Sequence, residues 1–155
     1  MVRGIFMRSP GATFDLRAAL SEEIRAAINA LDADPARRKS VRRCRLHLKR
    51  ARALARVGHA CAPGLAAVFN ESARSVSRTL AQAHDMTAIS DTARHLGKRV
   101  GKKQRATLIA VAEQYDAARE ALGPLNLEVV RTGLKDLLAL AQVWPEASAR
   151  QIHKG

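Results

Sequence analysis

Apolar residues recur at helical spacing along most of this 155-residue chain. In six stretches they are separated by three or four residues, which places them on one face of an α-helix. Gly, Pro or Asp lies at each boundary between these stretches, as is usual for turns and helix ends. The pattern predicts helices over about residues 16–31, 38–56, 65–83, 85–96, 104–122 and 126–143. Because short loops join antiparallel neighbours, we expect an all-α antiparallel helical bundle with a four-helix core and one or two additional helices.

Short polar residues mark the expected starts of several helices. Their side chains accept a hydrogen bond from a backbone N–H of the first turn, which stabilises a helix start. On this basis Thr13 or Asp15 caps the first helix. We likewise expect Ser40 to cap the second helix and Asp85 to cap the fourth.

The length of the chain bounds its domain organisation. A chain of 155 residues suffices for one core of ordinary size and is too short for two. We expect a basic N-terminal tail over residues 1–13, a single helical-bundle domain over residues 14–143 and a C-terminal tail over residues 144–155.

The second predicted helix carries two stripes of residues at three- and four-residue spacing. The first stripe is apolar and predicts the face that packs on the core: Val41, Cys44, Leu48, Ala51 and Ala55. The second stripe, which we call the cationic rail, consists of Arg38, Arg42, Arg45, Lys49, Arg52 and Arg56. At about 100° per residue the stripes lie a quarter to a third of a turn apart. The helix can therefore bury one stripe and expose the other.

Nothing nearby in the sequence compensates the charge of the cationic rail. Like charges four residues apart destabilise a helix by roughly 0.2–0.5 kcal/mol per pair, yet no acidic residue lies between Asp34 and Glu71. A helix that needed only solubility would interleave Glu. With about 1.5 Å of rise per residue the rail is about 27 Å long. We expect it to bind several successive charges of an extended polyanion.

The overall charge also indicates a polyanionic partner. The formal net charge is +13, which favours nucleic acid, inorganic polyphosphate or an anionic membrane surface as a partner. There are two cysteines, and Cys44 lies on the apolar stripe, so we expect reduced thiols and a cytoplasmic location. No run approaches the roughly 18 apolar residues of a membrane span, so we expect no membrane insertion.

Other candidate residues lie further along the chain. Arg74 and Arg78 form a second, shorter cationic patch, and His84 is a candidate phosphate contact beside Asp85. The segment GKRVGKK, residues 97–103, lacks the spacing of a glycine-rich phosphate loop. The carboxylates are scattered, and the Cys and His spacings fit no zinc site. We therefore expect no catalytic residue, no metal and no cofactor.

Two segments resemble the conserved histidine α-helical domain family, known as CHAD, whose members bind inorganic polyphosphate. The stretch VRRCRLHLKRARALARV, residues 41–57, resembles the central helix of the family, and NESARSVSRTLAQAHD, residues 70–85, resembles a second family block. Two positions depart from the family pattern. Arg42 stands in place of the name-giving histidine, and His84 stands in place of an arginine. Both keep a nitrogen donor that can carry positive charge.

The resemblance covers about residues 14–96 and implies a CHAD-like domain of about half the family length. Complete family domains are two four-helix bundles that face each other across a basic groove. The resemblance therefore implies a single lobe, and a homodimer would restore the facing arrangement.

The rail and the resemblance together lead to one functional expectation. We expect non-enzymatic binding of inorganic polyphosphate, in the cytoplasm and in association with polyphosphate granules. The expected binding residues are Arg38, Arg42, Arg45, Lys49, Arg52, Arg56, Arg74, Arg78 and His84. The alternative is a protein that binds the DNA or RNA backbone, because the same charge pattern suits any phosphate chain. Against that alternative, an aromatic content of 3% offers few side chains for base stacking.

Overall fold

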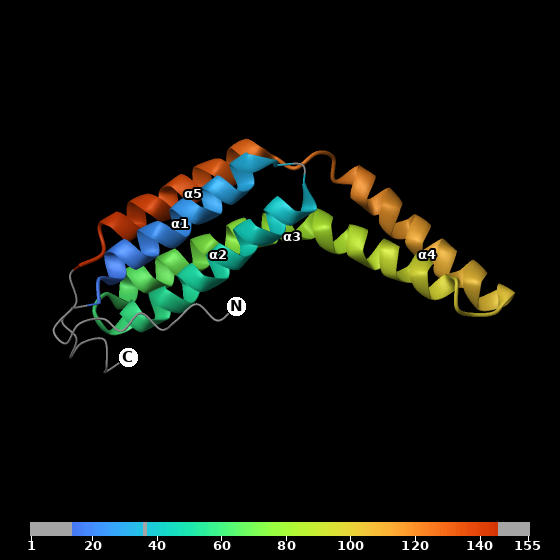
Figure 1. Cartoon of the computed structure of the whole chain (residues 1–155), viewed down its shortest axis with the longest axis horizontal. Helices are drawn as coiled ribbons and strands as arrows, with labels where there is room; N and C mark the ends of the chain where they lie inside the picture. Colours follow the sequence, from blue (N-terminus) through green and yellow to red (C-terminus); the bar gives the residue numbers. More distant parts are fainter. Residues whose placement is uncertain (1–13, 36, 146–155) are drawn as a thin grey trace, which may run out of the picture.

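The computed structural model describes residues 14–35 and 37–145, and these residues form five α-helices and no strand. The helices are α1 (Leu16–Ala33), α2 (Arg38–Val57), α3 (Pro63–Gly97), α4 (Lys102–Ala121) and α5 (Leu127–Gln142), with a short 3₁₀ turn at Gly58–Ala60. Figure 1 shows their arrangement. The all-α prediction is confirmed. The expected tails, except Trp144 and Pro145, lie outside the described residues.

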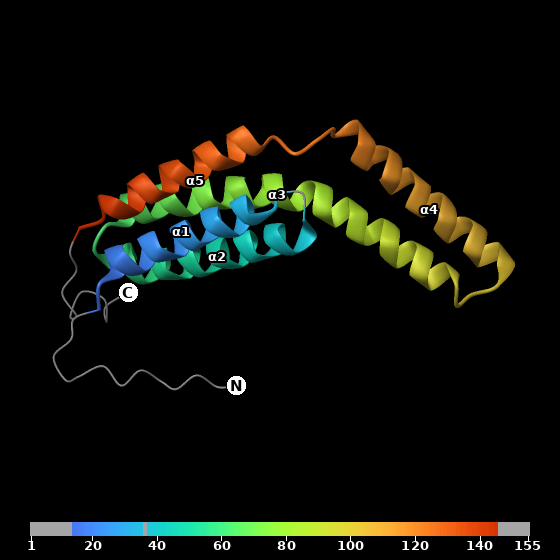
Figure 2. The same ribbon diagram turned by 45° about the horizontal axis from the view of Figure 1, so that its top comes forward.

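Four helices form the bundle. α1 packs against α2 and α5, and the first part of α3 packs against the same two helices, which closes a ring. Neighbours in this ring run in opposite directions (Figures 1 and 2). The predicted four-helix core with additional helical segments is therefore what the structure shows.

The core consists of the predicted apolar stripes. On α2, Cys44, Leu48, Ala51 and Ala55 are all fully buried, as the periodicity predicts, and Val41 packs against the edge of this core. The largest buried side chain is Trp144, whose ring meets that of Phe69 edge to face at a centroid distance of 5.8 Å. Trp144 lies just after α5, so the packed core extends one residue beyond the expected domain boundary.

The prediction of separate third and fourth helices is wrong. α3 is one helix of 35 residues, and Asp85 lies inside it rather than at a helix start. The segment 65–96 contains no Gly or Pro, so nothing interrupts its backbone. The Asp85 carboxylate instead lies 3.9 Å from the Arg45 guanidinium on α2.

The predicted cap at Ser40 is also wrong, whereas Asp15 caps α1 as expected. Arg37 occupies the N-cap position of α2 and its side chain makes no cap hydrogen bond. Ser40 lies within the first turn and is buried. Asp15 accepts a hydrogen bond of 3.0 Å from the Ala18 N–H.

The last part of α3, about residues 84–97, continues past the bundle and pairs with α4. We call these two segments the hairpin arm, and both views show it projecting from one end of the bundle (Figures 1 and 2). Ser90 donates a hydrogen bond to Asp116 and Arg94 forms an ion pair with the same carboxylate. At the turn, the Arg105 guanidinium donates to the Gly97 carbonyl.

Candidate polyanion-binding groove

The cationic rail lies on the side of α2 that turns away from the bundle core. Arg42, Lys49 and Arg56 are exposed, whereas Arg45 and Arg52 are half-buried. Half-burial is usual for arginines whose aliphatic stems pack on neighbouring side chains. The geometry that the helical spacing predicts for this helix is confirmed, with one apolar face inside and a cationic face beside it.

A groove of about 640 Å³ runs along this cationic face. We call it the cationic groove, and it is lined by Lys39, Arg42, Arg43, Arg45, Leu46, Lys49 and Arg52 of α2 together with Ser77 of α3. Six of these eight residues are cations and none is an acid. The structure thus brings together four of the predicted binding residues: Arg42, Arg45, Lys49 and Arg52.

Four residues of the groove were not among the predicted ones: Lys39, Arg43, Leu46 and Ser77. Lys39 and Arg43 lie next to rail positions in the sequence, so a single line of three- and four-residue steps passes them by. The groove is wider than this single line of residues, so Lys39 and Arg43 line it as well. Ser77 comes from α3, and its position depends on how α3 packs against α2. In the sequence, the density of cations on this helix, rather than their spacing, could have identified Lys39 and Arg43 as groove residues.

The remaining rail residues lie outside the groove. Arg56 is exposed near the end of α2. Arg38, at the opposite end, forms an ion pair of 3.4 Å with Asp91 of α3. Together with Arg45–Asp85, this pair provides the acidic compensation that the sequence around the rail lacks. Both pairs are largely exposed, so each contributes little to stability.

Arg52 differs from its neighbours in its hydrogen bonding. Its Nε atom is buried and has no hydrogen-bond partner. An unpaired buried donor costs about 1–3 kcal/mol relative to a satisfied one.

The two predicted arginines of α3 flank Ser77 without lining the groove. Arg74 and Arg78 are both exposed. Arg74 lies three residues before Ser77, so it shares the face of α3 that borders the groove. Asn70, a further turn back, lies on this face as well, and its Oδ1 atom is buried without a hydrogen-bond partner.

His84 is not brought to the groove. It lines a second pocket, of about 650 Å³, where the bundle meets the hairpin arm. Arg38, Arg119 and Asp34 line the same pocket, among mainly apolar residues. The neighbouring Asp85 points its carboxylate toward Arg45, so His84 and Asp85 serve different surfaces.

Three titratable groups outside the groove interact with neighbouring side chains of the fold: Cys44, His47 and Asp116. Burial, with a smaller effect from the negative charge of Asp32, raises the pKa of the Cys44 thiol from 9.0 to about 12. His47 Nδ1 lies 2.7 Å from the Glu23 carboxylate, between α2 and α1. Hydrogen bonds from Ser90 and then Arg94 lower the pKa of Asp116. Within residues 14–35 and 37–145, no group of three His, Cys, Asp or Glu side chains is placed to hold a metal.

Comparisons with known proteins add no relative: no family model, curated protein or solved structure matches this chain. No helix in the described part of the chain is long and apolar enough to span a membrane. The fold and the groove therefore define the protein as a helical bundle with a cationic groove along its second helix.

Proposed function

We propose that this chain binds inorganic polyphosphate in the cationic groove and does not chemically transform it. The observation that carries the proposal is the lining of the groove, in which six cations and no acid surround a volume of about 640 Å³. From Lys39 to Arg52 the lining covers 13 helical steps, or about 20 Å. A groove of this length suits a linear chain of phosphates better than a single small anion.

Binding would proceed by multivalent neutralisation. Arginine guanidinium groups form paired hydrogen bonds with phosphate oxygens, whereas Lys49 contributes a mobile point charge. Each contact releases a condensed counterion from the ligand, which provides an entropic driving force. Arg56, Arg74 and Arg78 lie at the margins of the groove, where a longer chain would meet them. Arg38 and His84 lie outside the groove, so they would contact only a ligand that extends past Lys39.

The resemblance to the CHAD family supports the same ligand. Arg42, which replaces the family histidine, is exposed and lines the groove. A permanent cation at that position favours phosphate regardless of pH, since arginine does not titrate in the physiological range. We extend the proposal to a cytoplasmic protein associated with polyphosphate granules, in line with its two free cysteines, one of which is buried.

A competition experiment tests the ligand. A fluorescent long-chain polyphosphate would be bound at physiological salt and displaced with unlabelled polyphosphate or a mixed-sequence DNA duplex. We expect polyphosphate to compete at least tenfold better than DNA, a difference of about 1.4 kcal/mol. Equal or better competition by DNA would replace the proposal with general phosphate-backbone binding. Release of phosphate in the presence of Mg²⁺ would show that the protein is an enzyme.

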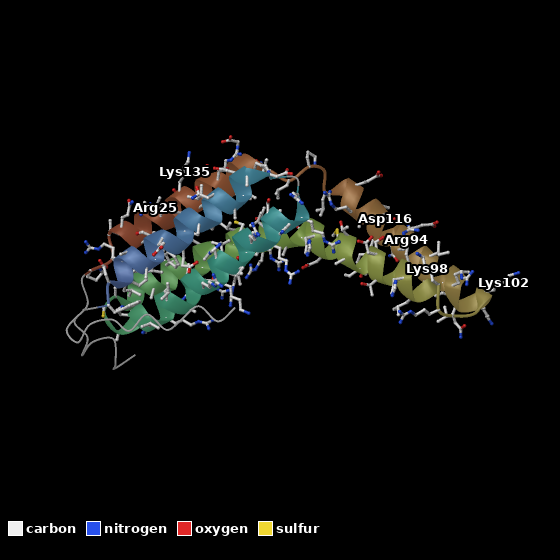
Figure 3. All side chains as sticks on the ribbon, viewed as in Figure 1. Arg25, Arg94, Lys98, Lys102, Asp116 and Lys135 are labelled. Carbon is white, nitrogen blue, oxygen red and sulfur yellow. The ribbon has the colours of Figure 1, made fainter. Side chains whose placement is uncertain are left out.

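A matched pair of variants tests the site. Arg42→Gln with Lys49→Gln removes two exposed cations from the groove, and we expect affinity for polyphosphate to fall at least tenfold. Arg25→Gln with Lys135→Gln also removes two exposed cations, from α1 and α5, which Figure 3 shows on the bundle away from the hairpin arm. The control pair should change the affinity less than threefold. Equal losses in the two pairs would show that net charge, not the groove, binds the ligand.

A further inference from the structure

The molecule bends where the hairpin arm leaves the bundle. In both views α2 and the arm half of α3 lie along the inner side of this bend, whereas α5 and α4 lie along the outer side (Figures 1 and 2). The first residue of α2, Arg38, contacts the arm through its ion pair with Asp91. A ligand that leaves the cationic groove at Lys39 therefore meets the arm next.

One face of α3 connects the groove with the end of the arm. Ser77 lines the groove, and His95 follows it by 18 residues, or five complete helical turns, so the two residues lie on the same face of α3. Lys98 lies three residues after His95, at the helix end where the backbone is still helical, and shares this face. The side chains of His95 and Lys98 are exposed.

The acidic residues along this path are already paired. Within residues 72–112 the only acids are Asp85 and Asp91. Asp85 lies 3.9 Å from Arg45, and Asp91 lies 3.4 Å from Arg38, so both are paired with arginines of the cationic rail. These ion pairs are largely exposed and therefore weak, so a phosphate chain can compete for the two arginines at little cost.

The far end of the arm carries cations that have no acidic partner. Lys98, Arg99, Lys102 and Lys103 form no ion pair with any described residue. Figure 3 shows Lys98 and Lys102 near the free end of the arm, beyond the Arg94–Asp116 pair. The repulsion among these cations is not relieved within the described chain, and a polyanion would relieve it.

The path from the groove to the end of the arm is longer than the groove itself. Arg52 and Arg38 are separated by 14 helical steps, or about 21 Å, and Asp91 and Lys98 by seven steps, or about 10 Å. Because Arg38 and Asp91 are in contact, the two lengths join into a path of about 31 Å. A chain of six phosphates, one for each groove cation, need not leave the groove. A longer chain can follow the whole path.

We propose that long polyphosphate chains extend from the cationic groove past Arg38 onto the arm, where His95, Lys98 and Arg99 bind them. A chain held in the groove presents its next phosphates to the arm at high effective concentration, so each arm contact adds affinity. The protein therefore prefers chains that are longer than the groove. This inference rests on polyphosphate as the ligand of the groove and adds to it a second contact surface and a length preference.

Two chain lengths and one pair of substitutions test the arm contact. Lys98→Gln with Arg99→Gln removes two arm cations, so we expect the affinity for long-chain polyphosphate to fall about tenfold and its salt slope to become shallower by about 1.4. The affinity for hexaphosphate should change less than about threefold, because this ligand stays in the groove. Arg25→Gln with Lys135→Gln removes the same charge from the bundle and should change neither affinity by more than about threefold.

The two chain lengths separate a failure of this inference from a failure of the proposed function. If hexaphosphate binds and the arm substitutions weaken both lengths equally, or weaken neither, the arm contact is overturned and the groove assignment stands. If neither length binds the wild-type chain, or if hexaphosphate binding survives Arg42→Gln with Lys49→Gln, the groove is not the site and the inference fails with it.

Asp91→Asn tests the same path by a gain of affinity, which a poorly folded variant does not produce. The substitution releases Arg38 and removes a negative charge from the path, so we expect long chains to bind about threefold more tightly and hexaphosphate to bind as before. The control, Asp32→Asn, likewise releases Arg131, on α5, and should leave both affinities unchanged. An equal gain in the two variants, or a gain in neither, would show that the chain does not pass Arg38.

Discussion

Among the cations that line the cationic groove, Arg52 is the one with a buried side-chain donor that lacks a hydrogen-bond partner. Its stem is half-buried and its Nε donor is buried without a partner. The other groove cations can be hydrated from the open side, but the inner edge of this guanidinium cannot. Arginine also presents its donors as a planar fork, so a phosphate in the groove can accept two hydrogen bonds at once from the terminal Nη groups.

This geometry predicts that Arg52 cannot be replaced by another cation. In Arg52→Lys the charge is kept but the fork is lost, so we expect polyphosphate affinity to fall about three- to tenfold. Folding stability should stay the same or rise slightly, because an unsatisfied buried donor is removed. Isothermal titration and urea unfolding of the same variant measure the two effects.

Arg50 offers the matched control for this substitution. It is an exposed arginine two residues earlier on α2 and does not line the groove. Arg50→Lys should leave the affinity within the error of the measurement. A comparable loss at both positions would mean that any arginine of α2 contributes equally, and that the groove does not orient the ligand.

At the scale of elements, the two halves of α3 experience different environments. The first half packs its apolar face against α2 and α5, and the second half has α4 as its main neighbour. The first half comes close to α5 at Gly133: a Cβ atom added there would lie 2.6 Å from Val76 Cγ2. The Val76 side chain thus occupies the space that a methyl group at Gly133 would need.

Gly133→Ala should therefore destabilise the bundle although alanine is the better helix former. The propensity gain within a helix is about 1 kcal/mol, whereas overpacking a core contact costs about 1–3 kcal/mol. We expect a net loss of up to about 2 kcal/mol, the overpacking cost less that gain, measured as a lower urea midpoint in circular dichroism.

Gly64, in the first turn of α3, is the control that separates the gain in helix propensity from the cost of overpacking. A Cβ atom added there meets nothing within 4 Å. Gly64→Ala should leave stability unchanged or raise it by up to about 1 kcal/mol. If Gly133→Ala also raised stability, the close packing of α3 and α5 at this point would be refuted.

For the whole molecule, the net charge of +13 means that any polyanion will be attracted over a long range. The groove adds a local contribution to binding. This contribution can be distinguished from the long-range attraction by the number of counterions that binding releases. For single-stranded phosphate chains, log affinity falls with log salt at a slope of about −0.7 per neutralised phosphate. Six groove cations that each meet one phosphate give a slope near −4.

We therefore predict that Arg42→Gln with Lys49→Gln makes the salt slope of polyphosphate binding shallower by about 1.4. The dissociation constant would be measured by fluorescence anisotropy over a series of salt concentrations. Arg25→Gln with Lys135→Gln removes the same charge from the molecule and should leave the slope nearly unchanged. Equal changes in slope would assign the binding to the general field of the protein.

The sequence by itself determined the helices and which residues share a face of each. The apolar stripe of α2 and the cationic line beside it follow from the 3.6-residue period alone, and both lie where that period predicts. The four core helices were predictable for the same reason. The continuity of α3 was not, because an aspartate signals a helix start only when the backbone before it is not helical.

Only the tertiary structure decided what each face meets. Periodicity carries no information about partners on other helices, so the ion pairs of Arg38 with Asp91 and of Arg45 with Asp85 could not be foreseen. The same holds for Ser77, which enters the groove from α3, and for His84, which lies in a different pocket. The hairpin arm arises because α3 is longer than the bundle that surrounds its first half. The residue pattern of α3 alone shows neither how other helices pack across it nor where along its length those helices end.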